Sequence, residues 1–183
     1  MQYLKTIQAM QVLGANVVTE ARSNLKKEKK QTRANTLYND MNYIVTSDKT
    51  GVELEWRFGG ASDYWDFVNE GVKGSGGFKG SGKMRGQGSP FSFKKKNIAK
   101  GVVLKWIANK PLKLRNTKGQ FKEKTQANLK SAAFLIGRAI AQRGLTRTLF
   151  FDNAYNQQLA KQENKITEAF ADDLEIQLET LIK

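Results

Sequence analysis

The chain has 183 residues, the size of one ordinary domain, and 39% of them are hydrophobic while 26% are charged, which is typical of folded soluble proteins. It contains neither cysteine nor histidine, which excludes disulfides, thiolate metal sites and catalysis by a cysteine nucleophile or an imidazole base. No apolar run approaches the roughly 20 residues needed to cross a bilayer, and the first residues lack the pattern of a signal peptide. We therefore expect no membrane-spanning segment, and the lack of cysteine fits synthesis in a reducing cytoplasm.

The net charge of +14 is concentrated in the middle of the chain. Residues 1–70 hold nine basic and nine acidic residues, residues 71–150 hold nineteen basic and one acidic, and residues 151–183 hold three basic and seven acidic. The three stretches therefore carry charges of zero, +18 and −4. Such polarised charge needs an anionic partner or screening by water. Nucleic acid, an anionic membrane and acidic patches on neighbouring subunits are three interpretations, and a solvated face kept for solubility is the fourth.

The N-terminal part of the chain predicts a helix followed by a β-hairpin. Apolar residues recur at three- and four-residue spacing over residues 3–28, as in an amphipathic helix. Residues 37–45 and 52–58 are predicted strands, and in the second one apolar and charged residues alternate strictly. The turn-forming residues 47–51 between them predict an antiparallel pair. One face of such a sheet has to be buried against helices.

A short helix is predicted after the hairpin, capped by Ser62 or Asp63 and running to about Glu70. Gly71 stands where a helix-terminating glycine is expected. The composition then changes abruptly, since residues 71–96 contain eight glycines, seven lysines or arginines and no acidic residue.

The C-terminal half predicts more helices. A helix over residues 97–109 stops before Pro111, and a basic connector follows over residues 112–123. A strong helix runs from a capping Thr125 to Arg143 and ends at Gly144. One helix, or a pair of helices, follows after residue 150.

These elements predict an α+β fold in which helices dominate and a small antiparallel sheet packs against them. We expect a single domain with one hydrophobic core. Its body comprises residues 1–71 and 97–183, and a long basic, glycine-rich loop forms an extended arm over residues 72–96.

Residues 77–83 match the first seven positions of a phosphate-binding P-loop. The eighth position, which should hold serine or threonine, is Met84, and neither a buried strand before it nor a helix after it is expected. A phosphate cradle needs backbone amides fixed between strand and helix. We therefore expect no nucleotide and no other cofactor to bind here.

Acidic residues offer the remaining route to catalysis. Glu53 and Glu55 share one strand face, whereas Asp63, Asp66 and Glu70 share the short helix. Metal or glycosidase chemistry needs carboxylates that converge in a cleft, but the strand pair alternates with core residues and should face solvent. We expect surface charge, no metal site and no catalytic residue, so the protein is predicted not to be an enzyme.

The glycine-rich loop is therefore the candidate functional element. Its eight glycines make it costly to order in isolation, and phenylalanines are interleaved with its positive charges. Such a pattern suits stacking on bases while cations hold phosphates, or an arm that anchors on a neighbouring subunit and becomes ordered only on assembly. The pattern does not choose between these roles. The candidate contact residues are Lys73, Phe78, Lys79, Lys83, Arg85, Phe91, Phe93, Lys94, Lys95 and Lys96.

Three segments resemble the tail-completion proteins of tailed bacteriophages, also called neck, minor tail or head–tail connector proteins. The most specific is residues 64–71, which are similar to the family's Tyr-x-x-(Phe/Tyr)-Val-Glu-x-Gly element. Residues 32–37 match a Thr–Gly/Ala-x-Leu-type segment, and residues 147–154 match a Pro-Phe-type segment in which Thr148 and Leu149 replace the usual small residue and proline. The family-like motif residues are Tyr64, Phe67, Val68, Glu70 and Gly71. The basic stretch over residues 74–124 departs from the family and looks like an enlarged insertion.

The resemblance implies a homo-oligomeric ring subunit of the virion, assembled in the host cytoplasm, between the capsid portal and the tail and around the channel through which DNA leaves. It implies portal, neck or tail proteins as neighbours, and no catalysis. The basic stretch would then face packaged DNA, in transient contact, or dock on acidic faces of neighbours such as the acidic tail of the next copy. We favour docking, because a strongly positive channel wall would hold DNA that must slide through, and because Phe78, Phe91 and Phe93 suit buried anchors. The alternative is a free basic protein that binds nucleic acid through residues 73–130.

Overall fold

The computed structural model describes residues 3–28, 36–79, 82–108, 113–115 and 118–182. Residues 32–35 of the family-like segment, residues 80–81 of the P-loop-like stretch, and the predicted helix end at Asn109 with Pro111 lie outside the described residues. The elements in chain order are α1 (Leu4–Lys27), α2 (Thr36–Asp40), β1 (Asn42–Ser47), β2 (Val52–Arg57), the 3-10 helix η1 (Gly59–Ala61), α3 (Trp65–Asn69), β3 (Val72–Lys73), α4 (Lys100–Ala108), α5 (Gln126–Arg143), β4 (Gly144–Leu145) and α6 (Phe150–Ile182). Both sheets are two-stranded and antiparallel, so the predicted α+β class is confirmed.

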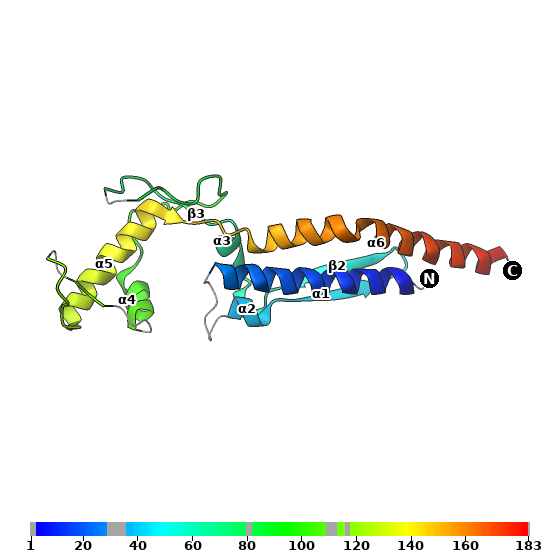
Figure 1. Ribbon diagram of the computed structural model, residues 1–183, viewed down its shortest axis with the longest axis horizontal. Coiled ribbons are helices and arrows are strands. Elements are labelled where there is room, and N and C mark those ends of the chain that lie inside the picture. The colour runs from blue at the N-terminus through cyan, green and yellow to red at the C-terminus, as the bar shows by residue number, and fades with distance from the viewer. Residues whose placement is uncertain (1–2, 29–35, 80–81, 109–112, 116–117, 183) are drawn as a thin grey trace. The chain divides into compact units, whose positions relative to one another are not determined.

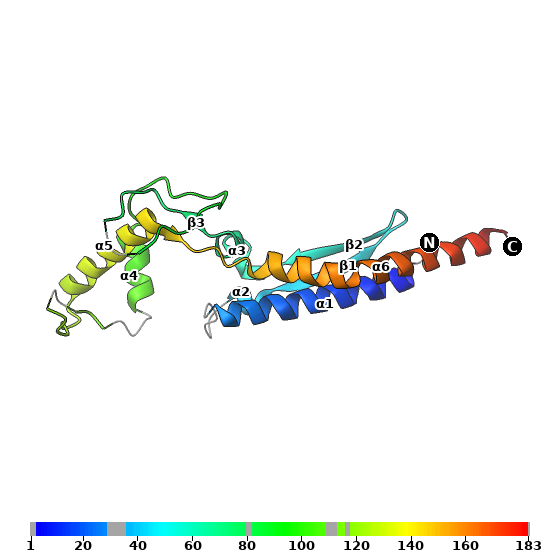
Figure 2. The same cartoon turned by 45° about the horizontal axis from the view of Figure 1, so that its top comes forward.

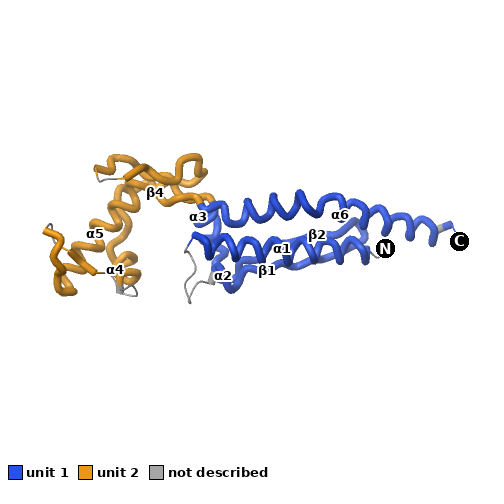
Figure 3. Tube along the Cα trace, viewed as in Figure 1, with its two compact units in different colours: residues 1–69, 148–183 blue, residues 70–147 orange. Residues whose placement is uncertain are grey.

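The chain divides into two compact units (Figure 3). Unit 1 comprises Met1–Asn69 and Thr148–Lys183, and unit 2 comprises Glu70–Arg147. The predicted body joined residues 97–147 to the N-terminal elements, whereas in the structure α4 and α5 belong to the same unit as the arm. The assignment of the whole chain to a single domain stays a prediction.

Unit 1 is built on the two long helices α1 and α6, which lie along each other with the hairpin β1–β2 beside them (Figures 1 and 2). The apolar stripe predicted for the first helix faces its core, which buries Leu13, Val17 and Leu25. Phe150 at the start of α6 is also fully buried. Residues 150–182 form one continuous helix, which settles the choice between one helix and two.

Gly14 in the middle of α1 is where the hairpin approaches the helix most closely. A Cβ atom at this position would lie only 2.6 Å from ring atoms of Tyr43 on β1. The glycine therefore allows the Tyr43 ring to pack directly against the helix backbone.

The predicted hairpin is confirmed, with Asn42 opposite Arg57 and Ser47 opposite Val52. The prediction of a strand from residue 37 is wrong, because residues 36–40 form α2 and the strand begins at Asn42. Leu37 and Met41 are both buried, and a spacing of four residues puts them on one face of a helix or of a strand alike. Asn39 would share that face in a strand, but it is exposed.

Unit 2 contains a second hydrophobic cluster, which the sequence prediction of a single core missed. Val103 and Ile107 of α4 are buried against Ala133 of α5. The predicted ends of α5 are confirmed. The Thr125 side chain accepts a hydrogen bond from the Asn128 N–H at 3.3 Å, and Gly144 ends the helix with φ +92°.

Candidate interaction surfaces

The basic arm is attached to its own chain at several backbone positions of unit 2. The Arg85 N–H donates to the Arg143 carbonyl at 2.8 Å, and the Ser75 N–H donates to the Ala141 carbonyl at 2.9 Å. Within the arm, the Lys73 N–H donates to the Phe91 carbonyl at 2.8 Å, and the Phe93 N–H donates to the Lys73 carbonyl at 2.9 Å. The described part of the arm is thus bonded to itself and to the end of α5, which differs from an arm that only a neighbouring subunit would order.

Two glycines make this close packing of the arm feasible. Gly86 has φ +66°, and a Cβ there would meet the carbonyl group of Val72. A Cβ at Gly144 would lie 2.7 Å from the Arg85 carbonyl oxygen. Because neither glycine has a side chain, the segment at residues 85–86 can lie closer to β3 and β4 than any larger residue would allow.

The predicted contact residues divide by exposure into anchors and a charged surface. Phe78, Phe91 and Phe93 are half-buried, and the Arg143 guanidinium lies 5.6 Å from the centre of the Phe78 ring. Arg143 Nε also donates to the Lys83 carbonyl at 2.8 Å. The cations Lys73, Lys79, Lys83, Arg85, Lys94, Lys95 and Lys96 are all exposed. The phenylalanines thus pack within unit 2, while the cations face solvent.

A groove lies where the arm meets the outer face of α5. It has a volume of about 310 Å³ and is lined by Phe78, Lys79, Leu135, Arg138, Ala139 and Gln142. Leu135 is 63% exposed although it is large and apolar. We call this feature the α5 groove, and it combines an apolar floor with two exposed cations.

The second basic connector carries an exposed aromatic ring between two cations. Phe121 is 62% exposed, and its ring centre lies 4.5 Å from the Arg115 guanidinium and 5.6 Å from Lys113 Nζ. A backbone bridge pairs Arg115 with Phe121.

The two family-like segments at residues 64–71 and 147–154 meet in the structure. In unit 1, the Asn69 carbonyl accepts hydrogen bonds from the N–H groups of Thr148 at 3.0 Å and Leu149 at 2.9 Å. The Asn69 side-chain oxygen accepts from the Phe151 N–H at 3.1 Å. In unit 2, Arg147 Nη2 donates to Glu70 Oε2 at 2.6 Å. Sequence reasoning singled out Glu70 but missed Asn69, which is buried and makes three of these four bonds.

Three of the other motif residues, Tyr64, Val68 and Gly71, have a structural role within their own unit, whereas Phe67 is exposed. The Tyr64 hydroxyl accepts from the Leu37 N–H at 3.3 Å, and Val68 packs against the core of unit 1. Gly71 has φ +68°, and a Cβ there would lie 2.6 Å from the Leu145 carbonyl oxygen, so the predicted helix-ending glycine is confirmed. Phe67 is 41% exposed.

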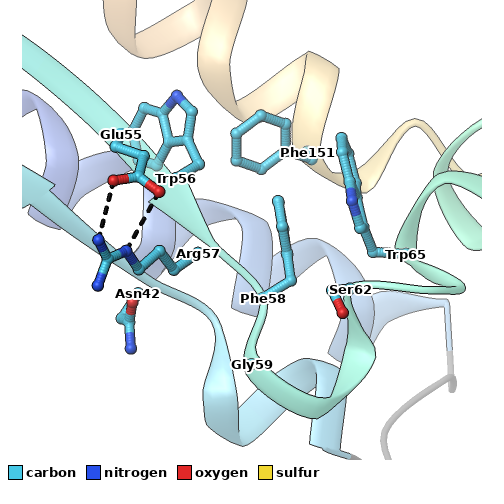
Figure 4. A pocket seen from close by; sticks show the side chains of 9 residues that line it. All are labelled: Asn42, Glu55, Trp56, Arg57, Phe58, Gly59, Ser62, Trp65 and Phe151. Atoms are coloured by element: carbon cyan, nitrogen blue, oxygen red, sulfur yellow. Dashed lines mark hydrogen bonds and ion pairs between the residues drawn. The ribbon is translucent and has the colours of Figure 1, made fainter.

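Unit 1 has an aromatic pocket that sequence reasoning did not single out (Figure 4). It has a volume of about 630 Å³, and Trp56, Phe58, Trp65 and Phe151 are among its lining residues. The rings of Phe58 and Trp65 stack with centres 4.1 Å apart, and Phe151 from α6 meets both edge-on. The alternation of Trp56 with Phe58, which follows β2, is the signal in the sequence for these rings. The polar lining residues are Asn42, Ser62 and the ion pair of Glu55 with Arg57, and the rings pack in the core of unit 1.

The candidate carboxylates are exposed on the hairpin and at Asp63, whereas Asp66 and Glu70 are half-buried. Glu53 and Glu55 are exposed as predicted, and a hydrogen bond from Arg57, 3.0 Å away, lowers the pKa of Glu55. Burial, with the neighbouring charge of Asp152, raises the pKa of Asp66. Within the described residues no three acidic side chains are grouped so that they could hold a metal ion, and no described helix is long and apolar enough to cross a membrane.

Charge separates between the two units. Unit 2 holds nineteen basic and two acidic residues, a net charge of +17, whereas unit 1 holds twelve basic and fifteen acidic residues, a net charge of −3.

Comparisons of the chain with protein-family models, curated proteins and solved structures found no match.

Proposed function

We propose that the chain is a structural virion protein of a tailed bacteriophage, a ring-forming neck or tail-completion subunit at the head–tail junction around the DNA channel. The observation that carries this proposal is the separation of charge between a unit of +17 and a unit of −3. Copies of such a chain attract one another when the basic unit of one faces the acidic unit of the next. A repeated contact between two different surfaces closes into a ring if its rotation allows.

The pairing of residues 64–71 with residues 147–154 supports the resemblance on which the virion role rests. These two family-like segments are far apart in sequence, yet Asn69 bonds to Thr148, Leu149 and Phe151 within unit 1. The segments therefore share one structural role. The proposal includes no catalysis and no cofactor, and its partners are other copies and neighbouring portal, neck or tail proteins.

Negative-stain electron microscopy of the purified chain, with class averaging of the particle images, tests the proposal. We expect closed rings of uniform diameter, and immunogold labelling of phage particles that encode the chain should mark the junction between head and tail. Labelling of the infected cell's DNA, with none on purified particles, would contradict the virion role.

Binding of nucleic acid through residues 73–130 is the second candidate function. The exposed Phe121 ring beside Arg115 and Lys113 favours it, because an exposed aromatic flanked by cations can stack on a base while the cations meet phosphates. Filter binding of the chain to DNA across a salt series separates the two functions. Tight binding whose constant falls steeply with salt supports the second, and weak binding together with rings supports the first.

A further inference from the structure

The C-terminal end of α6 continues past the start of α1 (Figures 1 and 2). Close to this end of α6, the ring of Phe170 stacks on that of Tyr3, with centres 5.9 Å apart, and Asp173 accepts hydrogen bonds from the first turn of α1. We call residues 174–182, the part of α6 after Asp173, the overhang. Its apolar side chains are exposed, since Leu174, Leu178 and Ile182 have exposed fractions of 37%, 60% and 85%.

The overhang is an amphipathic helical segment whose charged residues are all acidic. Leu174, Leu178 and Ile182 recur every four residues and so share one face, and Glu175 and Glu179 stand beside this stripe at the positions that follow the two leucines. Residues 166–182 contain five acidic residues and no basic one. Two overhangs would therefore repel each other, because like charges brought together are unfavourable. The partner of the stripe should be an apolar surface rimmed by cations.

The α5 groove of unit 2 has these properties. Leu135 and Ala139 lie one helical turn apart on α5 and line it together with Phe78 of the arm, whereas Lys79 and Arg138 supply positive charge. An apolar helix face that enters a groove of this kind is a recurrent mode of recognition. The exposed side chain of Leu135 leaves apolar surface in the groove on which another apolar side chain can pack.

We infer that the overhang of one copy binds in the α5 groove of a neighbouring copy. Leu178 enters between Phe78 and Leu135, and Glu175 and Glu179 approach Lys79 and Arg138 of that neighbour. The contact joins two different surfaces, so each copy offers one of each and the contact propagates from copy to copy. The inference deepens the proposed function and rests on it for closure of the ring, but the contact itself is argued from charge and exposure.

Cysteine cross-linking between two separately purified variants tests the contact directly. The chain has no cysteine, so Leu178→Cys in one preparation and Leu135→Cys in the other introduce one thiol each. We expect a disulfide-linked heterodimer when the two are mixed and oxidised. The matched control mixes Leu178→Cys with Val102→Cys, an equally exposed apolar position on α4. Equal yields in both mixtures, or none in either, overturn the inference.

Charge reversal provides the second measurement. Glu175→Lys with Glu179→Lys should weaken self-association on the order of 10–100-fold in sedimentation equilibrium, as should Lys79→Glu with Arg138→Glu. Mixing the two reversed proteins should restore association. Glu28→Lys with Glu53→Lys, at exposed acidic sites outside the overhang, is the control.

If the wild-type chain forms rings that both reversals leave intact, the inference fails while the proposed function stands. If rings are absent but the cross-link forms, the contact stands and the ring proposal fails.

Discussion

The carboxylate of Asp173 in α6 accepts two hydrogen bonds from Thr6 of α1, one from its main-chain N–H and one from its hydroxyl, both at 2.8 Å. The Lys5 N–H donates to the same carboxylate at 3.2 Å. The first amides of a helix have no acceptor within it, and a negative charge at that end is favourable. The C-terminal helix thus caps the N-terminal helix, and both residues are buried.

Replacing this carboxylate should destabilise unit 1. Asp173→Ala leaves the buried donors of Thr6 without an acceptor, and we expect the free energy of unfolding to fall by about 1–3 kcal/mol. Urea unfolding followed by circular dichroism measures the change. Asp172→Ala is the control, since Asp172 forms an exposed ion pair with Lys5 at 2.8 Å and such pairs contribute little. Equal losses in the two variants would show that Asp173 does not cap α1.

The same carboxylate should make stability depend on pH. Burial raises the pKa of Asp173, but the hydrogen bonds from Thr6 and Lys5 outweigh burial and hold the pKa below the ordinary value of 3.8. The folded state therefore binds this proton more weakly than the unfolded state. The stability that Asp173 supplies is fully present above the ordinary value and is lost as the pH falls through the lower folded pKa. The difference in unfolding free energy between wild type and Asp173→Asn should be larger at neutral pH than at about pH 3, and a constant difference would contradict the linkage.

Two helical glycines should respond to alanine with opposite signs. Alanine ordinarily stabilises a helix by up to about 1 kcal/mol relative to glycine, and at Gly101 of α4 the added Cβ meets open space. At Gly14 the Cβ would collide with the Tyr43 ring, and we expect Gly14→Ala to cost about 1–3 kcal/mol. Thermal unfolding of both variants measures this. Stabilisation by Gly14→Ala would mean that the hairpin does not pack on α1 as described.

Trypsin should discriminate among the cations of the arm. Both backbone groups of Lys73, and the N–H of Arg85, are hydrogen-bonded to other segments of unit 2, whereas Lys94, Lys95 and Lys96 are exposed in a stretch without helix or strand. A protease needs a locally open backbone, so cleavage after residues 94–96 should precede cleavage after residues 73 and 85. Mass spectrometry of the earliest fragments identifies the order. Initial cleavage at Lys73 would favour the detached arm that the sequence predicts.

The local parts of the fold could be predicted because their signals lie within a few residues. Strict alternation identified the strand at residues 52–57, and Thr125 and Gly144 marked the ends of α5. For residues 37–41 the sequence predicts a strand, because Leu37 and Met41 share one face in a strand as well as in a helix. Short segments with few apolar residues leave this ambiguity between helix and strand.

The remaining features depend on partners that are distant in sequence. Asn69 bonds to residues about 80 positions later, and nothing in its neighbourhood distinguishes it from other polar residues. The second core rests on Ala133 beside Val103 and Ile107, and a small residue gives little hydrophobic signal. The overhang exists because α6 extends beyond the start of α1, and the α5 groove exists because the arm folds back on its own chain. Neither relation can be read from one segment alone.

Self-assembly is the property on which the proposed role of this chain depends. Native mass spectrometry of the purified protein over a range of concentrations measures it. We expect one closed oligomer of fixed copy number that forms as the protein concentration rises. A monomer that persists at every concentration would show that the chain does not assemble with copies of itself.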